Sequence, residues 1–384
     1  MLEEADLATR LRYNYSRDSL EEKMRGQKEN QIVMLSALTP DQLVPQDHPI
    51  RRIKPIVDHA LNELSPVFSQ MYAAGGRPSI PPEHLLKASL LIALFSVRSE
   101  RQFCDRLRYD LLFKWFLDLN VMDDGFNPSV FSKNRERLLE HQVARGFLVK
   151  VIEEARRRHL LSADHFTVDG TLLEAWASLK SVHPKGEGKP PTSGSKNPEV
   201  DFRGQQRTND THQSTTDAEA RLARKGEGKE AKLCFAGHVL MENRNGLVVD
   251  MTLTQATGTA EREAALAMLT HVAGNQRITL AADKNYDTRD FVTVCRDWNV
   301  TPHVACRQST MLDRRTTRHA GYQLSQKIRK RVEEIFGWVK TVAGGRKLRY
   351  KGVQRNEFWM ELTVAAYDLV RMARLGPSEA DIDP

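Results

Sequence analysis

The chain of 384 residues is long enough for two or three domains with a sizeable core. It is 40% hydrophobic and 28% charged, which is ordinary for a soluble globular protein. Its formal net charge of +7 favours a polyanionic partner, although charge alone also fits a basic protein that has no such partner. Its four cysteines form no CxxC pair, which argues against a structural zinc site and fits a reducing cytosol.

Residues 1–40 are polar with little apolar periodicity, and we interpret them as a tail in which Met24 offers an alternative to Met1 as the translation start. The N-terminus lacks the apolar segment of a signal peptide. The most apolar run, "LLKASLLIALFSV", is too short to span a bilayer and contains Lys87, so we interpret it as a buried helix. We therefore expect a cytoplasmic protein with no membrane partner.

Residues 41–160 have the pattern of a helical region. "PPEHLLKASLLIALFSV" begins with prolines, which the first turn of a helix tolerates. Apolar residues recur at roughly helical spacing in "RSERQFCDRLRYDLLFKWFLDL". Another helix is expected in "NPSVFSKNRERLLEHQ", with Asn127 or Ser129 as its N-cap, and a further one ends in "EEARRRHLL".

Basic residues are interleaved with the apolar ones in this helical region, among them Arg98 and Arg101. A solvated helix surface would also have such a pattern. Because so many arginines lie together, we expect residues 41–160 to be an all-helical N-terminal domain that binds DNA, whose phosphates attract a basic surface.

The pattern changes to strands near residue 164. "HFTVDGTLL" alternates as a strand does and has Asp169 in its middle, and "KLCFAGHVLMENRNGLVVDMTLTQA" predicts two strands joined by a turn at 244–246. A helix in "GTAEREAALAMLTHVAG" should end near Gly274. It is followed by a strand in "ITLAADKNYDT" that ends at Asp283, a helix in "TRDFVTVCRDW", a short strand in "VTPHVAC" and a final helix that contains "RKRVEEIFGWVK".

An insertion at about 181–213 separates the first strand from the hairpin. It is rich in Gly, Pro, Ser and Lys and lacks apolar periodicity, so it predicts a mobile basic loop. The following "TTDAEARLARKG" predicts one short helix capped by Thr216 or Asp217. The strands and helices together predict an α/β catalytic domain at 161–375, followed by a tail at 376–384.

Three acidic positions follow the order of these elements: Asp169 on the first strand, Asp283 at the end of the fourth, and a glutamate on the final helix. This order matches a ribonuclease-H-like fold, a mixed five-stranded sheet with helices in which the first and fourth strands are neighbours. A cage of carboxylates suits Mg²⁺, and two such ions can activate a nucleophile and stabilise the leaving oxygen of a phosphodiester. A single aspartate at a strand end is usually a turn cap, so only the ordered set carries this hypothesis.

With these residues established, the chain from about residue 40 to 370 resembles a bacterial insertion-sequence transposase of the IS5 group, within the IS4-like DDE transposases. The resemblance rests on several long motifs in the right order: "VPQDHPIRRI", "RSERQFCDRLRYDLLFKWFLDL", "FTVDGTLLEAWAS", "TTDAEARLARKGEGKEAKLCFAGHVLMENRNGLVVD", "ATGTAEREAAL", "LAADKNYDT" and "RVEEIFGWVK".

The resemblance implies a transposase that binds the terminal inverted repeats of an element, cleaves its ends by metal-dependent hydrolysis and joins the 3′-OH ends to target DNA. It implies Asp169 and Asp283 as catalytic acids and metal ligands, and Mg²⁺, for which Mn²⁺ substitutes, as the cofactor, with two ions. The partners would be double-stranded DNA and further copies of the chain, in a homodimer or a higher synaptic assembly associated with the nucleoid.

The third acid must be one of two adjacent glutamates. The family signature is Tyr, two residues, Arg, three residues, Glu, six residues, Lys, and Arg329, Glu333 and Lys340 fit it, whereas Gln326 replaces the tyrosine. The resemblance thus implies Glu333 as the third catalytic acid and metal ligand. Helical projection places Arg329, Glu333 and Lys340 within about 40° of one another. An apolar stripe on the same helix should face the core, and it is formed by Ile328, Val332, Ile335, Val339 and Val342. Glu334 lies on the other flank of this stripe, where it could pair with Lys330 and Arg331.

Basic residues around this glutamate are expected to contact DNA phosphates, with an affinity that falls as salt rises. Besides Arg98 and Arg101, the predicted contacts are Arg329, Arg331, Lys340, Arg346 and Lys347. The competing interpretation is a solvated run of charge, or an intrahelical ion pair that contributes a few tenths of a kcal/mol.

Other candidates have weaker support. Glu174 is an auxiliary ligand or, more simply, a surface residue of a helix, while His238 and Glu242 favour core or sheet-surface roles. Trp176 and Trp338 could stack on a base, but packing explains them as well. Two rival functions remain open, namely a nuclease of the same fold that never joins strands, and an inactive transposase that only binds DNA.

Overall fold

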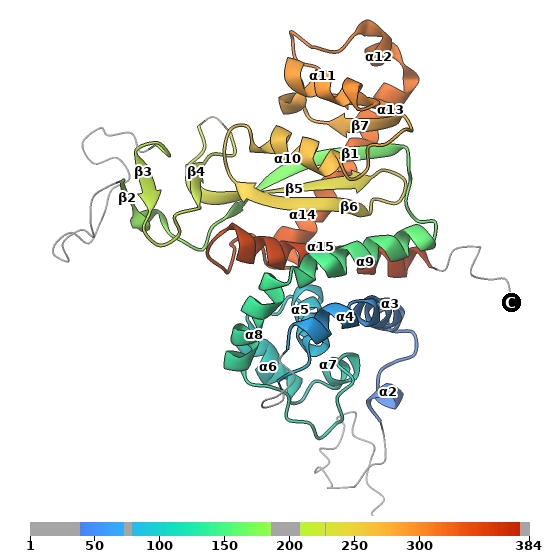
Figure 1. Ribbon diagram of the computed structural model, residues 1–384, viewed down its shortest axis with the longest axis vertical. Helices are drawn as coiled ribbons and strands as arrows, with labels where there is room; N and C mark the ends of the chain where they lie inside the picture. The colour runs from blue at the N-terminus through green and yellow to red at the C-terminus, as the bar shows by residue number, and fades with distance from the viewer. Residues whose placement is uncertain (1–38, 73–78, 186–207, 227, 377–384) are drawn as a thin grey trace, which may run out of the picture. The chain divides into compact units, whose positions relative to one another are not determined.

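The computed structural model describes residues 39–72, 79–185, 208–226 and 228–376 (Figure 1). The tail predicted at 1–40, with Met24, lies almost wholly outside these residues, as do most of the predicted basic loop and all but the first residue of the tail at 376–384. Within the described residues, no helix combines the length and the apolar character needed to cross a membrane.

Helices follow one another from residue 40 to residue 157. They are α2 (Pro40–Leu43), α3 (Ile50–Glu63), α4 (Ser65–Gln70), α5 (Pro82–Leu94), α6 (Glu100–Leu107), α7 (Leu111–Phe116), α8 (Pro128–Glu140) and α9 (Val143–Arg157). Asn127 is the N-cap of α8, since its side chain accepts a hydrogen bond from the Ser129 amide at 2.9 Å. The apolar pattern of 98–119 is divided between α6 and α7 because Asp110 caps the second helix through the Phe113 amide.

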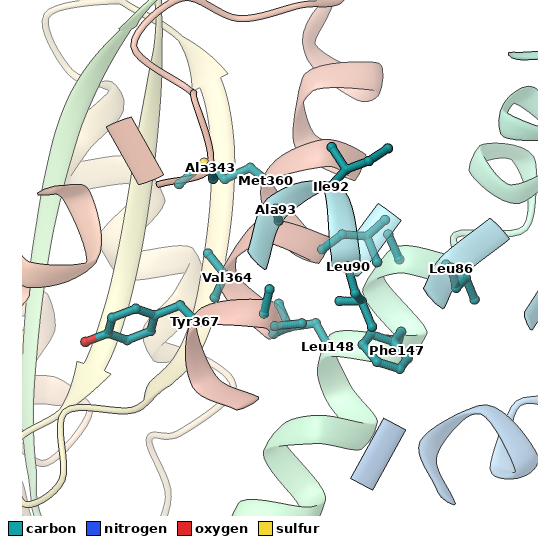
Figure 2. Close-up of a cluster of buried hydrophobic side chains, with 14 of the residues drawn as sticks. Leu86, Leu90, Ile92, Ala93, Phe147, Leu148, Ala343, Met360, Val364 and Tyr367 are labelled. Carbon is teal, nitrogen blue, oxygen red and sulfur yellow. The ribbon is translucent and has the colours of Figure 1, made fainter. Parts of the chain in front are cut away.

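The long helix α15 (Val353–Leu375) packs against α9, α5 and strand β6 and so joins the helical region to the sheet. Figure 2 shows Leu90 and Ile92 of α5, Phe147 of α9, and Met360 and Val364 of α15 in one apolar cluster. Because this cluster is shared, the helical region and one face of the sheet described below have a common core, while the other face of the sheet packs in a separate cluster.

A mixed sheet forms the second part of the structure. Its strands are β1 (His165–Glu174), β4 (Arg221–Ala223), β5 (Lys232–Glu242), β6 (Val248–Gln255), β7 (Ile278–Ala282) and β8 (Val300–Val304). β5 pairs antiparallel with β1, β4 and β6, while β1 pairs parallel with β7 and β7 with β8. The first and fourth predicted strands are therefore neighbours, as the sequence predicted.

Helices cover the two faces of this sheet differently. α10 (Ala260–Leu269) packs with the apolar residues that alternate along β1 from Phe166, whereas α14 (Val332–Thr341) and α15 lie on the opposite face (Figure 1). α11 (Arg289–Asp297), α12 (Arg314–Arg318), α13 (Ala320–Ile328) and a 3₁₀ turn, η3 (Arg329–Arg331), complete the chain between β7 and α14. Residues 165–375 thus have α/β architecture, with a helix on either side of β1.

Three sequence predictions need correction. The helix predicted in "TTDAEARLARKG" is wrong: a turn there leads into β4, which makes the described sheet six-stranded rather than five-stranded. The edge of β5 and the Asn209 side chain, which hydrogen-bonds both the amide and the carbonyl of Leu222, outweigh the local helix preference. α10 ends at Leu269 rather than near Gly274, and the predicted loop is flanked by a small ladder of β2 (Val182–Pro184) and β3 (His212–Ser214).

Candidate active site

Two carboxylates lie side by side where β7 ends. The parallel register of β1 and β7 ends at the pair Thr167 and Ala281. Asp169 lies two residues further along β1, and Asp283 lies two residues beyond Ala281, just after the end of β7. Asp283 follows the last residue of β7 and accepts a hydrogen bond from the Asn285 amide at 2.7 Å. The structure therefore brings together two of the three acids predicted from the sequence.

The surroundings of this pair disfavour two negative charges. Burial, and then the charge of Asp283, raise the pKa of Asp169 to about 6, against the opposing effects of the Gly170 amide and the Arg329 guanidinium. Arg329 is near enough to influence Asp169, and its Nε atom is buried without a hydrogen-bond partner among the described residues. Asp169 and Asp283 thus form a centre of negative charge that a bound cation would stabilise.

The helix α14 approaches β1 from the face to which Asp169 and Thr171 belong. Its apolar residues Val332, Ile335 and Val339 are buried, as predicted, and Lys340 donates a hydrogen bond to the Thr171 hydroxyl. Glu333 lies on this helix between the two basic residues that reach β1. It is exposed, and within the described part of the chain it makes no hydrogen bond or ion pair.

The neighbouring glutamate has a different environment. Glu334 forms an ion pair with Arg371 of α15, with 2.8 Å between Oε2 and Nη1, so its predicted pairing with Lys330 and Arg331 is wrong. Arg331 instead donates hydrogen bonds to the carbonyls of Asn243 and Arg244 in the β5–β6 turn. The reason is that residues 329–331 form a 3₁₀ turn, in which successive side chains turn by about 120° rather than 100°.

A third carboxylate that the sequence analysis did not select lies beside the pair. A Cβ atom on Gly170 would lie 3.4 Å from Glu261 Oε1 and 3.0 Å from His238 Nδ1. Burial, and then the charge of Asp283, raise the pKa of Glu261. Glu261 belongs to the quoted motif "ATGTAEREAAL", but a glutamate in the first turn of a helix is so ordinary that its sequence gave no signal for a site.

The donor set at this centre suits a divalent ion. In the described residues, no group of three histidine, cysteine, aspartate or glutamate side chains converges closely enough to hold a metal. Asp169 and Asp283 nevertheless provide carboxylate oxygens from two sides, and Mg²⁺ is commonly held by one or two carboxylates, with water and substrate phosphate completing its shell. The residues therefore fit Mg²⁺ or Mn²⁺ better than a soft metal such as zinc, which prefers sulfur and nitrogen ligands.

The weaker candidates from the sequence have structural roles. Glu174, which ends β1 and is not on a helix, forms ion pairs with Lys232 at 3.2 Å and Lys347 at 3.9 Å. The carboxylate of Glu242 accepts hydrogen bonds from several backbone amides of the β5–β6 turn. Trp338 packs edge-on against Tyr367. These residues stabilise the sheet and α15 rather than the acidic centre.

Some of the predicted DNA contacts come together at a second place. Arg98 of the helical region, Lys347 and the half-exposed Trp176 line one cavity of about 800 Å³. Lys351 lies over the Trp176 ring at 5.4 Å from its centroid. Arg101 and Arg346, which do not line this cavity, are exposed. The cavity thus joins basic and aromatic groups from both parts of the chain, although about 250 residues separate them in sequence.

Comparisons with known proteins give two family matches. A transposase domain (DUF772) matches residues 38–137, and a transposase DDE domain matches residues 201–369. Together they cover more than half of the chain and include Asp283 and Glu333, whereas Asp169 lies between the two matched ranges. No curated protein matches the chain.

Among solved structures, the chain is similar to the piggyBac transposase in a synaptic complex with hairpin DNA, with 9% identity and a TM-score of 0.40 over 84% of this chain and 74% of that one. It is also similar to the transposase of the Mos1 strand transfer complex, with 10% identity and a TM-score of 0.19 over 77% and 79% of the two chains. Both TM-scores are below 0.5, so the relation of this chain to transposases rests on the two family matches.

Proposed function

We propose, on the premise that the chain belongs to the DDE transposases, that it is a DNA transposase of the IS5 group with a ribonuclease-H-like catalytic domain, which cleaves the ends of its element and joins them to target DNA. The observation that supports this best is the proximity of Asp169 on β1 to Asp283 at the end of the adjacent parallel strand β7, where the charge of Asp283 raises the pKa of Asp169. Two such carboxylates suit a divalent cation such as Mg²⁺.

In this proposal Asp169, Asp283 and Glu333 hold the metal, with Mg²⁺ or Mn²⁺ as the ion and two ions in the working centre. The bound ions supply Lewis-acid stabilisation of the attacking and leaving oxygens. Glu333 joins from α14 when the substrate is bound, because its exposed side chain has no competing ion pair in the described chain. Arg329 and Lys340, on the same side of β1, offset the charge of the scissile phosphate.

The chemistry consists of two phosphoryl transfers at one centre. In the first, the oxygen of a water molecule attacks phosphorus at the element end, the bond to the 3′ oxygen breaks, and the end is left with a 3′-OH. In the second, this 3′-OH attacks a phosphodiester of the target and releases a target 3′-OH. The carboxylates act by positioning, since phosphoryl transfer needs little covalent help from the protein.

DNA would reach this centre along the basic surface of the helical region, residues 41–160. Arg98, Arg101, Arg346 and Lys347 are proposed to contact its phosphates, while Arg331 is left out because it holds the β5–β6 turn. Two element ends must meet for joining, so the working form is a homodimer or a larger assembly on DNA.

The test uses a labelled duplex made from the DNA that flanks the gene, where short inverted repeats should be found. Wild type, Glu333→Gln and Glu334→Gln are compared with Mg²⁺ or Mn²⁺, since Glu334 is the adjacent and equally exposed glutamate. Wild type and Glu334→Gln should nick at the repeat boundary, while Glu333→Gln binds but cleaves about a thousandfold more slowly, equivalent to the several kcal/mol that a metal contributes.

Each other outcome has a defined meaning. Loss of cleavage in Glu334→Gln instead would show that the acid of α14 is assigned wrongly. Binding by all three proteins without cleavage would favour an inactive, DNA-binding transposase. Cleavage without transfer of a pre-cut 3′-OH end to a plasmid would favour a nuclease that never joins strands.

A further inference from the structure

Gly170 leaves an opening in β1 directly beside Asp169. Residues 169 and 170 point to opposite faces of the sheet. Phe166 and Val168, on the same face as position 170, pack with residues of α10, whereas Thr171, on the same face as Asp169, accepts a hydrogen bond from Lys340 of α14. Because residue 170 is a glycine, β1 has no side chain of its own on the α10 face at this point. Glu261 of α10 takes the space, and its Cγ would lie 3.3 Å from a Cβ atom on residue 170. The missing side chain lets Glu261, on the α10 face of the sheet, approach Asp169 and Asp283, although Asp169 points to the opposite face.

Two buried polar side chains in this region have an atom without a hydrogen-bond partner among the described residues: Tyr286, three residues after Asp283, and His238, opposite Gly170. Tyr286 is fully buried, and its hydroxyl has no hydrogen bond among the described residues. Burial above all, and then the charges of Glu261, Asp169 and Asp283, raise the pKa of Tyr286 well above the usual range. Because a buried hydroxyl without a partner is unfavourable, this hydroxyl favours a ligand or the water shell of a ligand at this place.

The second unpaired group is His238, which pairs with Gly170 across β1 and β5 and is fully buried. Its Nε2 lies 2.8 Å from the Thr254 hydroxyl, and its Nδ1 has no partner in the described chain. Burial lowers the pKa of His238 to about 4, so the ring is neutral near pH 7 and adds no charge that would repel a cation. The opening at Gly170 is thus bordered by the Glu261 carboxylate and the neutral His238 ring, while Tyr286 belongs to the turn that follows Asp283.

We propose that Glu261 moves in as a further ligand when a divalent ion binds at Asp169 and Asp283, with Tyr286 and His238 as positioning residues that hold it and the water of the ion in place. Without the ion, the three carboxylates of the described chain do not converge closely enough to form a metal site by themselves. The proposal rests on the metal centre of the proposed function and adds to it a carboxylate from the α10 face, opposite to that of Glu333. Removing a ligand or the groups that orient it costs about tenfold to a hundredfold in metal affinity.

The experiment measures Mn²⁺ binding to the full chain by electron paramagnetic resonance, together with the unfolding temperature with and without the ion. Four proteins are compared: wild type, Glu261→Gln, Glu263→Gln and Asp169→Asn. Glu263 is the matched control, since it is an exposed glutamate in the first turn of the same helix. We expect Glu261→Gln to bind Mn²⁺ at least about tenfold more weakly and Glu263→Gln to bind like wild type.

The metal-free proteins separate a ligand from a merely structural residue. Without metal, Glu261→Gln should unfold at the same temperature as wild type or higher, because it removes one of three like charges; with Mn²⁺, its rise in unfolding temperature should be smaller. Tyr286→Phe should also weaken Mn²⁺ binding, by a smaller factor and without loss of metal-free stability. If Glu261→Gln fails to fold, Glu261→Asp, which retracts the carboxylate by one methylene, must bind Mn²⁺ more weakly than wild type.

The outcomes distinguish this inference from the function on which it rests. Equal Mn²⁺ affinity in wild type and Glu261→Gln, with loss of binding in Asp169→Asn, would overturn the role of Glu261 and leave the proposed centre intact. Unchanged binding in Asp169→Asn would overturn the centre itself.

Discussion

Two groups of buried charge in this protein are organised in opposite ways. In the helical region, Lys87 is 4% exposed and lies 2.6 Å from Asp58, while Lys54 lies 2.6 Å from Asp118 and 2.7 Å from Asp58. Lys87 also contacts Asp118, so two cations face two anions. At the sheet, Asp169 and Glu261 lie near enough to Asp283 for its charge to raise the pKa of both, and Arg329 beside Asp169 and Arg262 beside Glu261 offset this only in part.

The pKa values of the two groups differ accordingly. Although burial alone would raise the pKa of Asp118, hydrogen bonds from Lys54 and Lys87 lower it, which favours the charged form. Burial and neighbouring carboxylates instead raise the pKa values of Asp169 and Glu261. A balanced group stabilises the fold by itself, whereas an unbalanced group stores unfavourable energy that a bound cation can release, and this difference separates a structural site from a functional one.

The largest expected effect is the pH dependence that Asp169 gives to the metal-free protein. Its pKa is about 6 in the folded state and 3.8 in the reference state, so below pH 3.8 it is protonated in both states and costs nothing. As the pH rises to 6 and beyond, the folded state loses up to roughly 3 kcal/mol relative to the unfolded state. Urea unfolding of wild type and Asp169→Asn in the presence of a chelator should show this difference growing between pH 4 and pH 6 and vanishing at lower pH.

Mn²⁺ should cancel most of that pH-dependent loss in wild type, since the ion favours the charged carboxylates. A stability difference that does not change between pH 4 and pH 6 would mean that Asp169 is not in the repulsive environment described above.

The balanced group should respond in the opposite way to a loss of charge. Lys87→Met leaves Asp58 and Asp118 with only Lys54 and should destabilise the protein by about 2–3 kcal/mol, less than for a fully buried pair because both aspartates are partly exposed. Urea unfolding at neutral pH measures the effect, and Mn²⁺ should not reverse it. A neutral or stabilising substitution would remove the contrast between the two groups.

The contrast was only partly predictable from the sequence. Asp169 and Asp283 could be placed together because strand order fixes which strands are neighbours, and this needs no side-chain detail. Glu261, on α10, could not be found, since its approach depends on the absence of a side chain at Gly170 of β1, about 90 residues earlier in the chain. Similarly, the pairing of Glu334 was predicted wrongly because a single 3₁₀ turn before α14 changes the direction of Arg331.

Gly170→Ala should have a smaller effect. The new Cβ atom would lie 3.0 Å from His238 Nδ1 and 3.3 Å from Glu261 Cγ, which is too close for either to stay in place. We expect a destabilisation of about 1–2 kcal/mol and a severalfold weaker affinity for Mn²⁺ as Glu261 moves away. Gly258→Ala is the matched control, because a Cβ atom there meets nothing within 4 Å and the residue lies just before α10. Wild-type Mn²⁺ affinity in Gly170→Ala would show that the opening does not serve the metal centre.

The smallest effect should come from Glu334→Gln, which breaks the ion pair with Arg371 of α15. Glu334 is 55% exposed on its side chain, so the pair should contribute less than about 1 kcal/mol to stability, and high salt should reduce the difference from wild type. Arg371 keeps its hydrogen bonds to the Asn245 carbonyl and the Tyr367 hydroxyl, which limits the loss further. Glu333, one residue away, has no such partner among the described residues, so Glu333→Gln should leave stability nearly unchanged. A large loss of stability in Glu333→Gln, together with a small one in Glu334→Gln, would show that Glu333 has the structural role and would contradict its proposed catalytic role.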